Sequence, residues 1–490
     1  MRSITRPLAK QPFFLFHVLA TIFAWMFVWH HASTMDIVYD EASSYYILKT
    51  GNYKALPGVA NTHWLNSFFM RLMMIFNESV IALRLHVIIA FPFFAQGIYR
   101  LAALIKSTGA QIAFYCLIIF NPYILDFFSL ARGYSLAITL QVWTILAFIK
   151  AVQTDFNYRQ WIKLIILSAL TLGANLSYQY TIMAITGGYL LYCSITDSLM
   201  SWYANIQKRR ITALFVLLLF FSTADLLFIK YYGKDLEFGG KENFIGSVFN
   251  TFWDKSLYKA SYTPLSFWLS WCTFALILMA GIYFIRKTIQ QKKWSPGIII
   301  TFITGSIFLL GLIFHLVLNT PYIANRTALQ WYVPGLLTIF LAVGEWQIPV
   351  KKYRFIGYAL GTATCILVIF HFVTRYNSRR CMEYYMEDPT RQPLYDLYAQ
   401  RPARPSLSFW IAGTYIGYYS QVDQLAPSGV IFEEFTNEPL TNKAIQTLNE
   451  SDYILSHTIT TTRFLDSAHI RYTVIKSYPD SDFKVIRLYH

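Results

Sequence analysis

The sequence predicts an all-α polytopic membrane bundle of about eleven transmembrane helices, followed by a small C-terminal α/β extramembrane domain. Hydrophobic residues form 55% of the 490-residue chain and charged residues only 14%, whereas about a quarter of the residues in soluble domains are charged. Apolar windows of about 18 or more residues recur along the first three quarters of the chain, as membrane-spanning helices require. The remaining part has short apolar segments separated by turn residues, a pattern typical of strands.

The candidate spans are the apolar segments of about twenty residues. They define a transmembrane domain at 1–374 and lie roughly at 13–30, 80–104, 110–125, 134–150, 161–176, 178–196, 211–230, 264–285, 296–318, 328–345 and 355–374.

Basic residues predict the orientation of these spans. The chain has 41 Lys and Arg against 26 Asp and Glu, a net charge of +15. Most of the basic residues cluster in alternate turns between spans, so the positive-inside tendency explains the charge without a nucleic-acid partner. The N-terminal segment has no small-residue cleavage site and is expected to remain as an uncleaved first span. We therefore expect a multi-pass membrane protein with a cytoplasmic N-terminus and a C-terminal domain on the opposite side of the membrane.

The first periplasmic loop, 31–79, is predicted to contain two interfacial helices. In "DEASSYYILKTG" the side chains of Ala42, Tyr45, Tyr46 and Leu48 are expected to share a face, and the helix should end at Gly51. The segment "WLNSFFMRLMMIF" also has an apolar face.

The C-terminal domain is expected at 375–490. Its predicted strands are separated by Pro, Gly, Asn and Asp, and they are "SLSFWIAG", "GVIFEEF", "DYILSHTI", "RYTVIKSY" and "FKVIRLYH".

Two adjacent carboxylates, Asp40 and Glu41, follow the first span closely. A solvated loop pair is the ordinary explanation in a soluble protein. Beside a membrane, and ahead of an interfacial helix, the pair is a candidate catalytic site. A carboxylate in a partly dry site is suited to act as a general base on a hydroxyl group.

Charged residues also occur at the outer ends of later spans. Asn121-Pro122 interrupts the third span, and Asp126 and Arg132 follow it. Arg326 precedes a late span on the same side, against the positive-inside tendency. Pairing with a carboxylate, anchoring at lipid headgroups and binding a phosphate all remain open for these arginines.

Arg84, inside an apolar run, is a functional candidate unless a partner such as Glu78 satisfies it. His63 and Lys54 are weaker substrate-binding candidates, since a loop histidine is more often structural and a loop lysine is often solvated. The five cysteines form no CxxC pair.

The sequence contains no P-loop, GxGxxG or GxSxG motif, so a nucleotide donor is not expected. Carboxylates beside arginines suit a sugar donor linked to a lipid phosphate. The arginines would neutralise the leaving phosphate while a carboxylate deprotonates the acceptor.

Four motifs occur in order along the chain: "DEA" in the first loop, "ALRL" at the start of the second span, "NPYILDFFSLARGYSLA" in the second loop and "NRTALQWYVP" before a late span. Their order resembles that in GT-C membrane glycosyltransferases. The chain thus resembles the bacterial branch of the protein O-mannosyltransferase and aminoarabinose-transferase superfamily, and its uncharacterised Bacteroidetes members in particular.

The resemblance implies an inverting transfer from a polyprenyl-phosphate sugar to an extracytoplasmic acceptor. It assigns Asp40 as the base, with Glu41 and Asp126 as further acidic positions of the same cavity. Arg132 and Arg326 would lie near the donor phosphate, and Tyr134 of the second motif is another candidate substrate-binding residue.

The expected partners are the lipid donor, the bilayer and a glycan, lipid or protein acceptor. No cofactor is expected, although the paired carboxylates leave a divalent metal open. Three other functions remain open: a flippase for lipid-linked saccharides, a glycan ligase or polymerase, and a non-catalytic scaffold.

Overall fold

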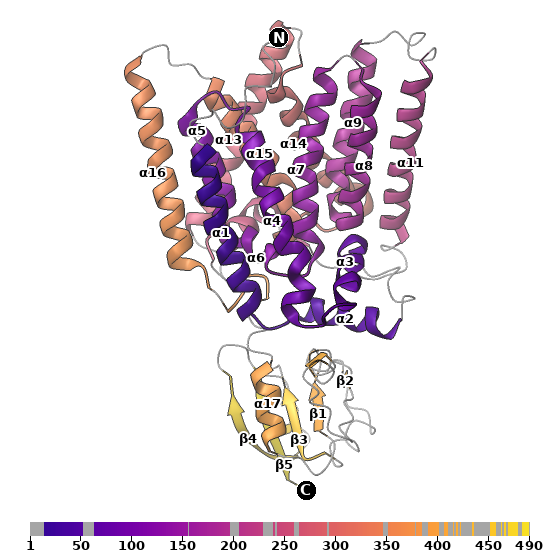
Figure 1. Cartoon of the computed structure of the whole chain (residues 1–490), viewed down its shortest axis with the longest axis vertical. Coiled ribbons are helices and arrows are strands. Elements are labelled where there is room, and N and C mark those ends of the chain that lie inside the picture. The colour runs from indigo at the N-terminus through magenta and orange to yellow at the C-terminus, as the bar shows by residue number, and fades with distance from the viewer. Residues whose placement is uncertain are drawn as a thin grey trace. The chain divides into compact units, whose positions relative to one another are not determined.

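A computed structural model covers the whole chain (Figure 1). It describes 14–51, 63–154, 156–196, 205–228, 239–240, 243–258, 264–291, 294–345, 351–377, 379–384 and 391–400. In the C-terminal part it describes 406–409, 415, 418–419, 422, 434–435, 451–456, 462, 465–466, 469–478 and 483–489. The predicted substrate-binding residue Lys54 lies outside these ranges.

The chain divides into two compact units. The first comprises Met1–Trp29, Leu56–Phe69 and Leu85–Tyr376, and the second comprises His30–Ala55, Met70–Arg84 and Asn377–His490. The first unit therefore contains most of the helical bundle. Most of the first loop belongs with the C-terminal segment in the second.

The first unit consists almost entirely of helices. Those that lie in it, wholly or in part, are α1 (Phe14–Thr34), α3 (Trp64–Met74), α4 (Val80–Ala102), α5 (Thr108–Ile119), α6 (Pro122–Phe128), α7 (Gly133–Gln153), α8 (Tyr158–Ala174), α9 (Gln179–Thr196), α11 (Ile206–Phe228), α12 (Thr251–Ser256), α13 (Pro264–Gln291), α14 (Pro296–Leu318), α15 (Leu329–Glu345) and α16 (Lys351–Arg375). Short turns are η3 (Leu176–Tyr178), η5 (Gly246–Asn250) and η6 (Asn325–Ala328).

The protein is a multi-pass membrane protein, but the expected count of about eleven spans is not confirmed. Within the described residues, six helices are long and apolar enough to cross a bilayer, and a bent pair makes up to seven. Helices α8, α9, α11 and α16 occupy the positions of other expected spans. Of these, α8 has 17 residues, slightly fewer than the usual span of about twenty.

The bent pair confirms the interruption predicted at Asn121-Pro122. Helices α5 and α6 meet at an angle of 54°. Asn121 caps α6 by accepting the N–H of Tyr123 at 3.0 Å, and Pro122 occupies the first helical turn. Asn at the N-cap followed by Pro is a favourable start for a new helix.

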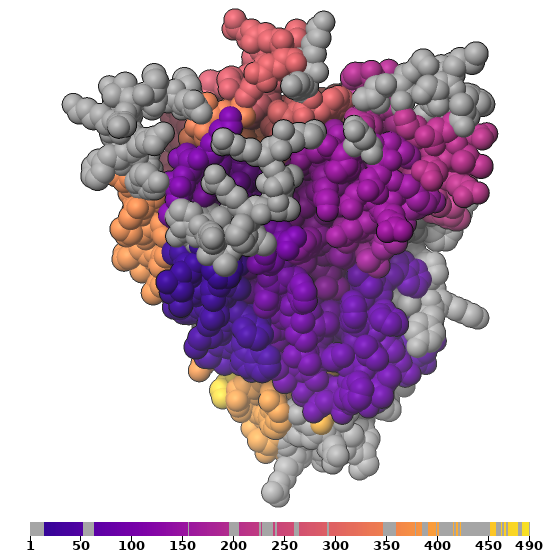
Figure 2. Space-filling model, turned by 45° about the horizontal axis from the view of Figure 1, so that its top comes forward, coloured from indigo at the N-terminus to yellow at the C-terminus, as the bar shows by residue number. Residues whose placement is uncertain are grey.

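Apolar side chains on the outside of the bundle are suited to lipid. Figure 2 shows α1 and α16 at its surface, where Leu15 and Met26 of α1 and Leu367 and Phe370 of α16 are each more than 60% exposed. The two helices pack through Phe372, whose ring lies 5.0 Å from that of Phe27. A surface of this kind requires an apolar environment.

The second unit contains α2 (Tyr39–Thr50), α17 (Arg391–Ala399) and a five-stranded sheet. Its strands, in the order β2-β1-β3-β5-β4, are β1 (Ser406–Phe409), β2 (Glu434–Phe435), β3 (Tyr453–Ser456), β4 (Arg471–Ser477) and β5 (Lys484–Tyr489). Strand β1 is parallel to β2 and β3, whereas β5 is antiparallel to β3 and β4. Ile454, Leu465, Ile486 and Leu488 form its core. All five segments predicted as strands contain one.

Helix α2 begins and ends close to where the sequence predicted. Gly51 terminates it in the left-handed conformation, with a φ of 70°, which glycine adopts without steric cost. Ala42, Tyr45 and Leu48 are buried, but Tyr46 is 51% exposed. The expectation that Tyr46 shares their face was wrong, because it lies one residue beyond Tyr45 and is rotated by about 100° around the helix.

Candidate active site

The predicted site residues fall into both compact units. Asp40, Glu41 and Arg84 lie in the second unit, and His63, Asp126, Arg132, Tyr134 and Arg326 lie in the first.

The acidic pair lies in the first turn of α2, where the helix dipole favours negative charge. Glu41 is the third residue of the helix, and its Oε2 accepts the backbone N–H of Val38 at 3.1 Å. This is the returning half of a capping box. Glu41 therefore fixes the start of the helix, and Asp40 is presented from the same turn.

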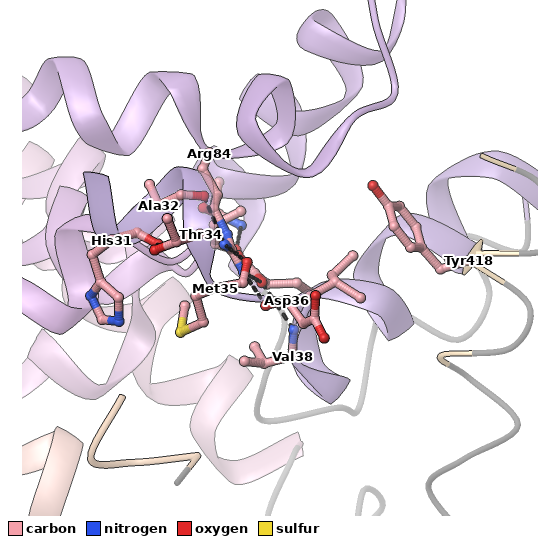
Figure 3. A network of polar contacts seen from close by, with 12 residues as sticks. His31, Ala32, Thr34, Met35, Asp36, Val38, Arg84 and Tyr418 are labelled. Atoms are coloured by element: carbon pink, nitrogen blue, oxygen red, sulfur yellow. Dashed lines mark hydrogen bonds and ion pairs between the residues drawn. The ribbon is translucent and has the colours of Figure 1, made fainter. Parts of the chain in front are cut away.

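Arg84 holds Glu41 through two charge-assisted hydrogen bonds. Its Nε and Nη2 donate to the two carboxylate oxygens at 2.9 and 2.5 Å. The guanidinium also donates to the backbone carbonyl oxygens of Ala32, Met35 and Asp36 at 3.0, 2.8 and 2.7 Å (Figure 3). Both side chains are buried, so this pair is an organising centre of the first loop.

Glu78, the partner that the sequence suggested for Arg84, instead bonds Lys49 and Tyr45. Lys49 Nζ lies 2.5 Å from one oxygen of Glu78, and the Tyr45 hydroxyl donates to the other at 2.5 Å. Burial alone would raise the pKa of Glu78, but the hydrogen bonds from Lys49 and Tyr45 outweigh it and lower that pKa. Burial and the bond to Glu78 raise the pKa of Tyr45.

Asp40 has a tyrosine partner from the C-terminal segment. The hydroxyl group of Tyr384 donates to Asp40 Oδ2 at 2.5 Å, and both side chains are only 9% exposed. Two residues 344 positions apart in the chain thus meet. The neighbouring carboxylates differ in their partners: Glu41 bonds a guanidinium and Asp40 a neutral phenol.

In the first unit, Asp126 is buried on α6 and accepts the hydroxyl group of Tyr258. The distances from the phenolic oxygen to the two carboxylate oxygens are 2.8 and 3.0 Å. Tyr258 has a φ of 56°, in the left-handed region that a bulky side chain rarely adopts. Strained residues of this kind concentrate at functional sites.

Gly133 allows close packing at the start of α7. A Cβ atom there would lie 1.9 Å from the carbonyl oxygen of Ala174 and 2.6 Å from Cγ of His63. Only glycine therefore fits between these neighbours. The absence of a side chain lets Tyr134 approach His63, and their rings lie 5.2 Å apart in an edge-to-face arrangement.

His63 immediately precedes α3, and that helix is hydrogen-bonded to the segment just before α7. The Asn66 amide donates to the carbonyl oxygen of Ala131 at 2.8 Å, and its oxygen bonds the His86 ring at 2.8 Å. Arg132, which follows Ala131, is 1% exposed and adopts an extended backbone as the N-cap of α7.

Arg326 is presented by a strained turn. Asn325 has a φ of 48°, and its backbone N–H donates to Thr251 Oγ1 at 3.0 Å. The guanidinium carbon of Arg326 lies 5.8 Å from the centre of the Tyr134 ring, within cation–π range. Tyr134 therefore contacts both His63 and Arg326, which come from segments far apart in the sequence.

Among these predicted residues of the first unit, two arginines accompany one aspartate. Among the described residues, no group of three or more His, Cys, Asp or Glu side chains is arranged to hold a metal ion.

Sequence reasoning missed Tyr384 and Tyr258. No spacing rule connects Tyr384 with residue 40 across the whole bundle. Tyr258 lies among several tyrosines in the sequence, and nothing in its local pattern marks it. Its positive φ appears only in the structure.

Comparisons with known proteins identify the fold. No family model matches the chain, and no curated protein sequence matches it either. Among solved structures, ArnT from Cupriavidus metallidurans bound to undecaprenyl phosphate is similar with a TM-score of 0.57 and 10% identity, over 97% of both chains.

Two further structures agree with this result. The apo state of the same ArnT gives a TM-score of 0.54 at 9% identity, covering 96% of this chain and 97% of the other. The apo oligosaccharyltransferase of Archaeoglobus fulgidus gives 0.52 at 11% identity, covering 92% of this chain and 70% of the other. The chain therefore has the GT-C fold that the sequence motifs predicted.

Proposed function

We propose that this GT-C membrane protein is a glycosyltransferase that moves a sugar from a polyprenyl-phosphate donor to an extracytoplasmic acceptor. The similarity to ArnT over 97% of both chains, in a structure with undecaprenyl phosphate bound, carries this proposal. A fold shared along the whole chain includes both the bundle and the C-terminal segment.

Asp40 is assigned as the general base. Its carboxylate takes the proton of the acceptor hydroxyl group as the oxygen attacks the anomeric carbon of the sugar. The new glycosidic C–O bond forms while the bond between the anomeric carbon and the phosphate oxygen breaks. A single displacement of this kind inverts the anomeric configuration, and the lipid phosphate leaves with the bonding electrons.

The residues around Tyr134 are assigned to the donor. Arg132 and Arg326 supply positive charge for the phosphate, where charge accumulates as the bond to the sugar breaks. Tyr134 and His63 offer an aromatic surface and polar edges to the sugar. Asp126, anchored by Tyr258, is assigned to a sugar hydroxyl group in the same cavity.

Glu41 is assigned to support rather than to proton transfer. Its carboxylate oxygens bond the Arg84 guanidinium and the N–H of Val38. Arg84 likewise serves the first loop, because its donors are directed to Glu41 and to backbone carbonyl groups.

The location is part of the proposal. We assign the protein to the bacterial inner membrane because its motifs resemble those of bacterial GT-C glycosyltransferases, and the charge pattern supports a cytoplasmic N-terminus and a periplasmic C-terminal domain. Reporter fusions after residue 377 test this assignment. A cytoplasmic signal there would place Asp40 on the wrong side for a periplasmic acceptor.

The direct test is reconstitution of the purified chain in liposomes with undecaprenyl-phosphate sugars and lipid, glycan or peptide acceptors. Mass spectrometry should detect a glycosylated acceptor and released undecaprenyl phosphate in equal amounts. A flippase would instead move the intact lipid-linked sugar across the bilayer without a new glycosidic bond, and that result would contradict the proposal. Comparing glycolipids and glycoproteins from cells with and without the chain would identify the acceptor.

A further inference from the structure

Three tyrosines of the C-terminal segment contact the first loop within the second unit. The hydroxyl group of Tyr384 donates to the Asp40 carboxylate at 2.5 Å. The hydroxyl group of Tyr418 donates to the backbone carbonyl oxygen of Glu78 at 2.9 Å, and that of Tyr419 accepts the N–H of Ile37 at 3.1 Å. Two of the three contacts therefore involve the loop backbone, and one reaches the proposed base.

We propose that Tyr384 is a positioning residue for Asp40, so that the segment after the last bundle helix supplies part of the active site. This inference rests on the proposed function, in which Asp40 is the base. It gives the C-terminal segment a role in turnover as well as in folding.

The position of Tyr384 is well defined by its neighbours. Its backbone N–H donates to the carbonyl oxygen of Cys381 at 3.2 Å, which closes a turn. Cys381 and Met382 are 1% and 5% exposed, so this turn is anchored by buried side chains. Such a support holds the phenol in one place before substrate arrives.

A phenol is a suitable partner for a general base. A hydrogen bond to an ionised carboxylate is short and strong, so it restricts rotation of the short Asp side chain. Because the phenol is neutral, it orients the carboxylate without cancelling its charge. Glu41 beside it bonds a guanidinium, which does cancel the charge.

Three other carboxylates of the first loop have partners of their own. Glu41 bonds Arg84, and Asp36 accepts the backbone N–H of Arg391 at 2.9 Å. Glu78 bonds Lys49. None of these three bonds involves the Tyr384 hydroxyl group, so its removal leaves them in place.

The experiment compares Tyr384→Phe with Tyr418→Phe and Tyr419→Phe in the full-length chain. Each variant loses one hydroxyl group that reaches the first loop, so the two controls match the chemistry of the change. Turnover is measured in liposomes with the undecaprenyl-phosphate sugar that the wild type uses, over a range of donor concentrations and pH.

Tyr384→Phe is expected to lower kcat by about 10- to 100-fold, the size expected for a lost hydrogen bond to a charged group. The donor KM should stay within about twofold, because the phosphate contacts are unchanged. The acidic limb of the kcat profile should move to higher pH, because the lost bond favoured the ionised carboxylate. The controls should keep kcat and the profile of the wild type.

Tyr384→His, which keeps a ring N–H donor, should recover part of the lost kcat. It also serves as the second variant if Tyr384→Phe gives too little folded protein, as judged by its unfolding midpoint in detergent. Equal losses in all three phenylalanine variants would overturn the inference, because the tyrosines would then act only in docking the segment.

The two proposals fail in different ways. If Asp40→Asn is inactive while Tyr384→Phe matches the wild type in kcat and pH profile, the positioning role is overturned and the proposed function stands. If Asp40→Asn is as active as the wild type, Asp40 is not the base, and both the base assignment and the role of Tyr384 are overturned.

Discussion

The first loop and the surroundings of Tyr134 differ in the partners of their charged side chains. In the first loop, two carboxylates form ion pairs: Arg84 bonds Glu41, and Lys49 bonds Glu78. At Tyr134, the guanidinium of Arg326 lies over an aromatic ring instead. The first arrangement fixes a backbone, whereas the second is the one to which we assign the donor phosphate.

The difference shows that burial of a charged residue beside a membrane is not enough to assign it a catalytic role. Glu41 and Arg84 are as buried as any catalytic group, yet their partners are each other and the backbone. Asp40, one residue away, accepts the hydroxyl group of Tyr384. Burial alone therefore does not identify function, and the partners of each charged group have to be compared as well.

The largest expected effect comes from Asp40→Asn. Loss of a general base should reduce transfer by about 10²- to 10⁴-fold, measured as glycosylated acceptor formed in liposomes. Asp36→Asn is the matched control from the same segment and should retain most activity. Near-normal transfer by Asp40→Asn would contradict the role of Asp40.

Arg84→Met should destabilise the protein rather than alter its chemistry selectively. It leaves the Glu41 carboxylate buried without its cation, which costs about 3–5 kcal/mol. Unfolding in detergent, followed by intrinsic fluorescence, would measure the loss. The double variant Arg84→Met/Glu41→Leu removes both charges and should recover much of the stability. No recovery would show that the bonds to the backbone carbonyl groups dominate.

Arg326→Gln should weaken donor binding without unfolding the bundle. Removing one charge-assisted contact costs about 1.5–3 kcal/mol, which appears as a higher donor KM or weaker binding of undecaprenyl phosphate. Arg286→Gln, in one of the basic clusters predicted to be cytoplasmic, is the control and should bind normally. Unchanged affinity in both Arg326→Gln and Arg132→Gln would remove the phosphate role from this region.

The smallest expected effect is the pH dependence contributed by Glu78. Because its pKa is lowered in the folded protein, its contribution to stability is present above its ordinary pKa of 4.5 and is lost as the pH falls through the folded value. The ion pair with Lys49 is partly exposed, so the effect should stay below about 1 kcal/mol. Glu78→Gln should make the free energy of unfolding depend less on pH below pH 4.5. An unchanged slope of this free energy against pH would mean that other carboxylates determine the dependence.

Local patterns in the sequence predicted most of the fold. The five strand segments, the end of α2 at Gly51 and the break at Asn121-Pro122 all follow from short-range propensities. The span count was less predictable, because an apolar helix such as α8, with 17 residues, is at the lower end of the lengths that cross a bilayer. The face of Tyr46 was wrongly predicted, because adjacent residues of a helix point in directions about 100° apart.

The site was only partly predictable for a different reason. The sequence suggested that His63, Tyr134 and Arg326 bind the same substrate, and the structure brings them together. The partners of the carboxylates, Tyr384 and Tyr258, come from segments that carry no motif. Long-range pairing depends on the packing of the whole bundle, which a single sequence does not specify.

The guanidinium group of Arg84 also acts as a C-terminal cap for α1. The last carbonyl groups of a helix lack partners within it, and Arg84 supplies donors to Ala32 in the final turn and to Met35 and Asp36 just beyond. The number of residues between the first span and the acidic pair is therefore fixed by the reach of one side chain. A single residue inserted between Thr34 and Tyr39 would shift Glu41 relative to the Ala32 carbonyl group that the same guanidinium bonds, so this short connection should tolerate substitution far better than any change in length.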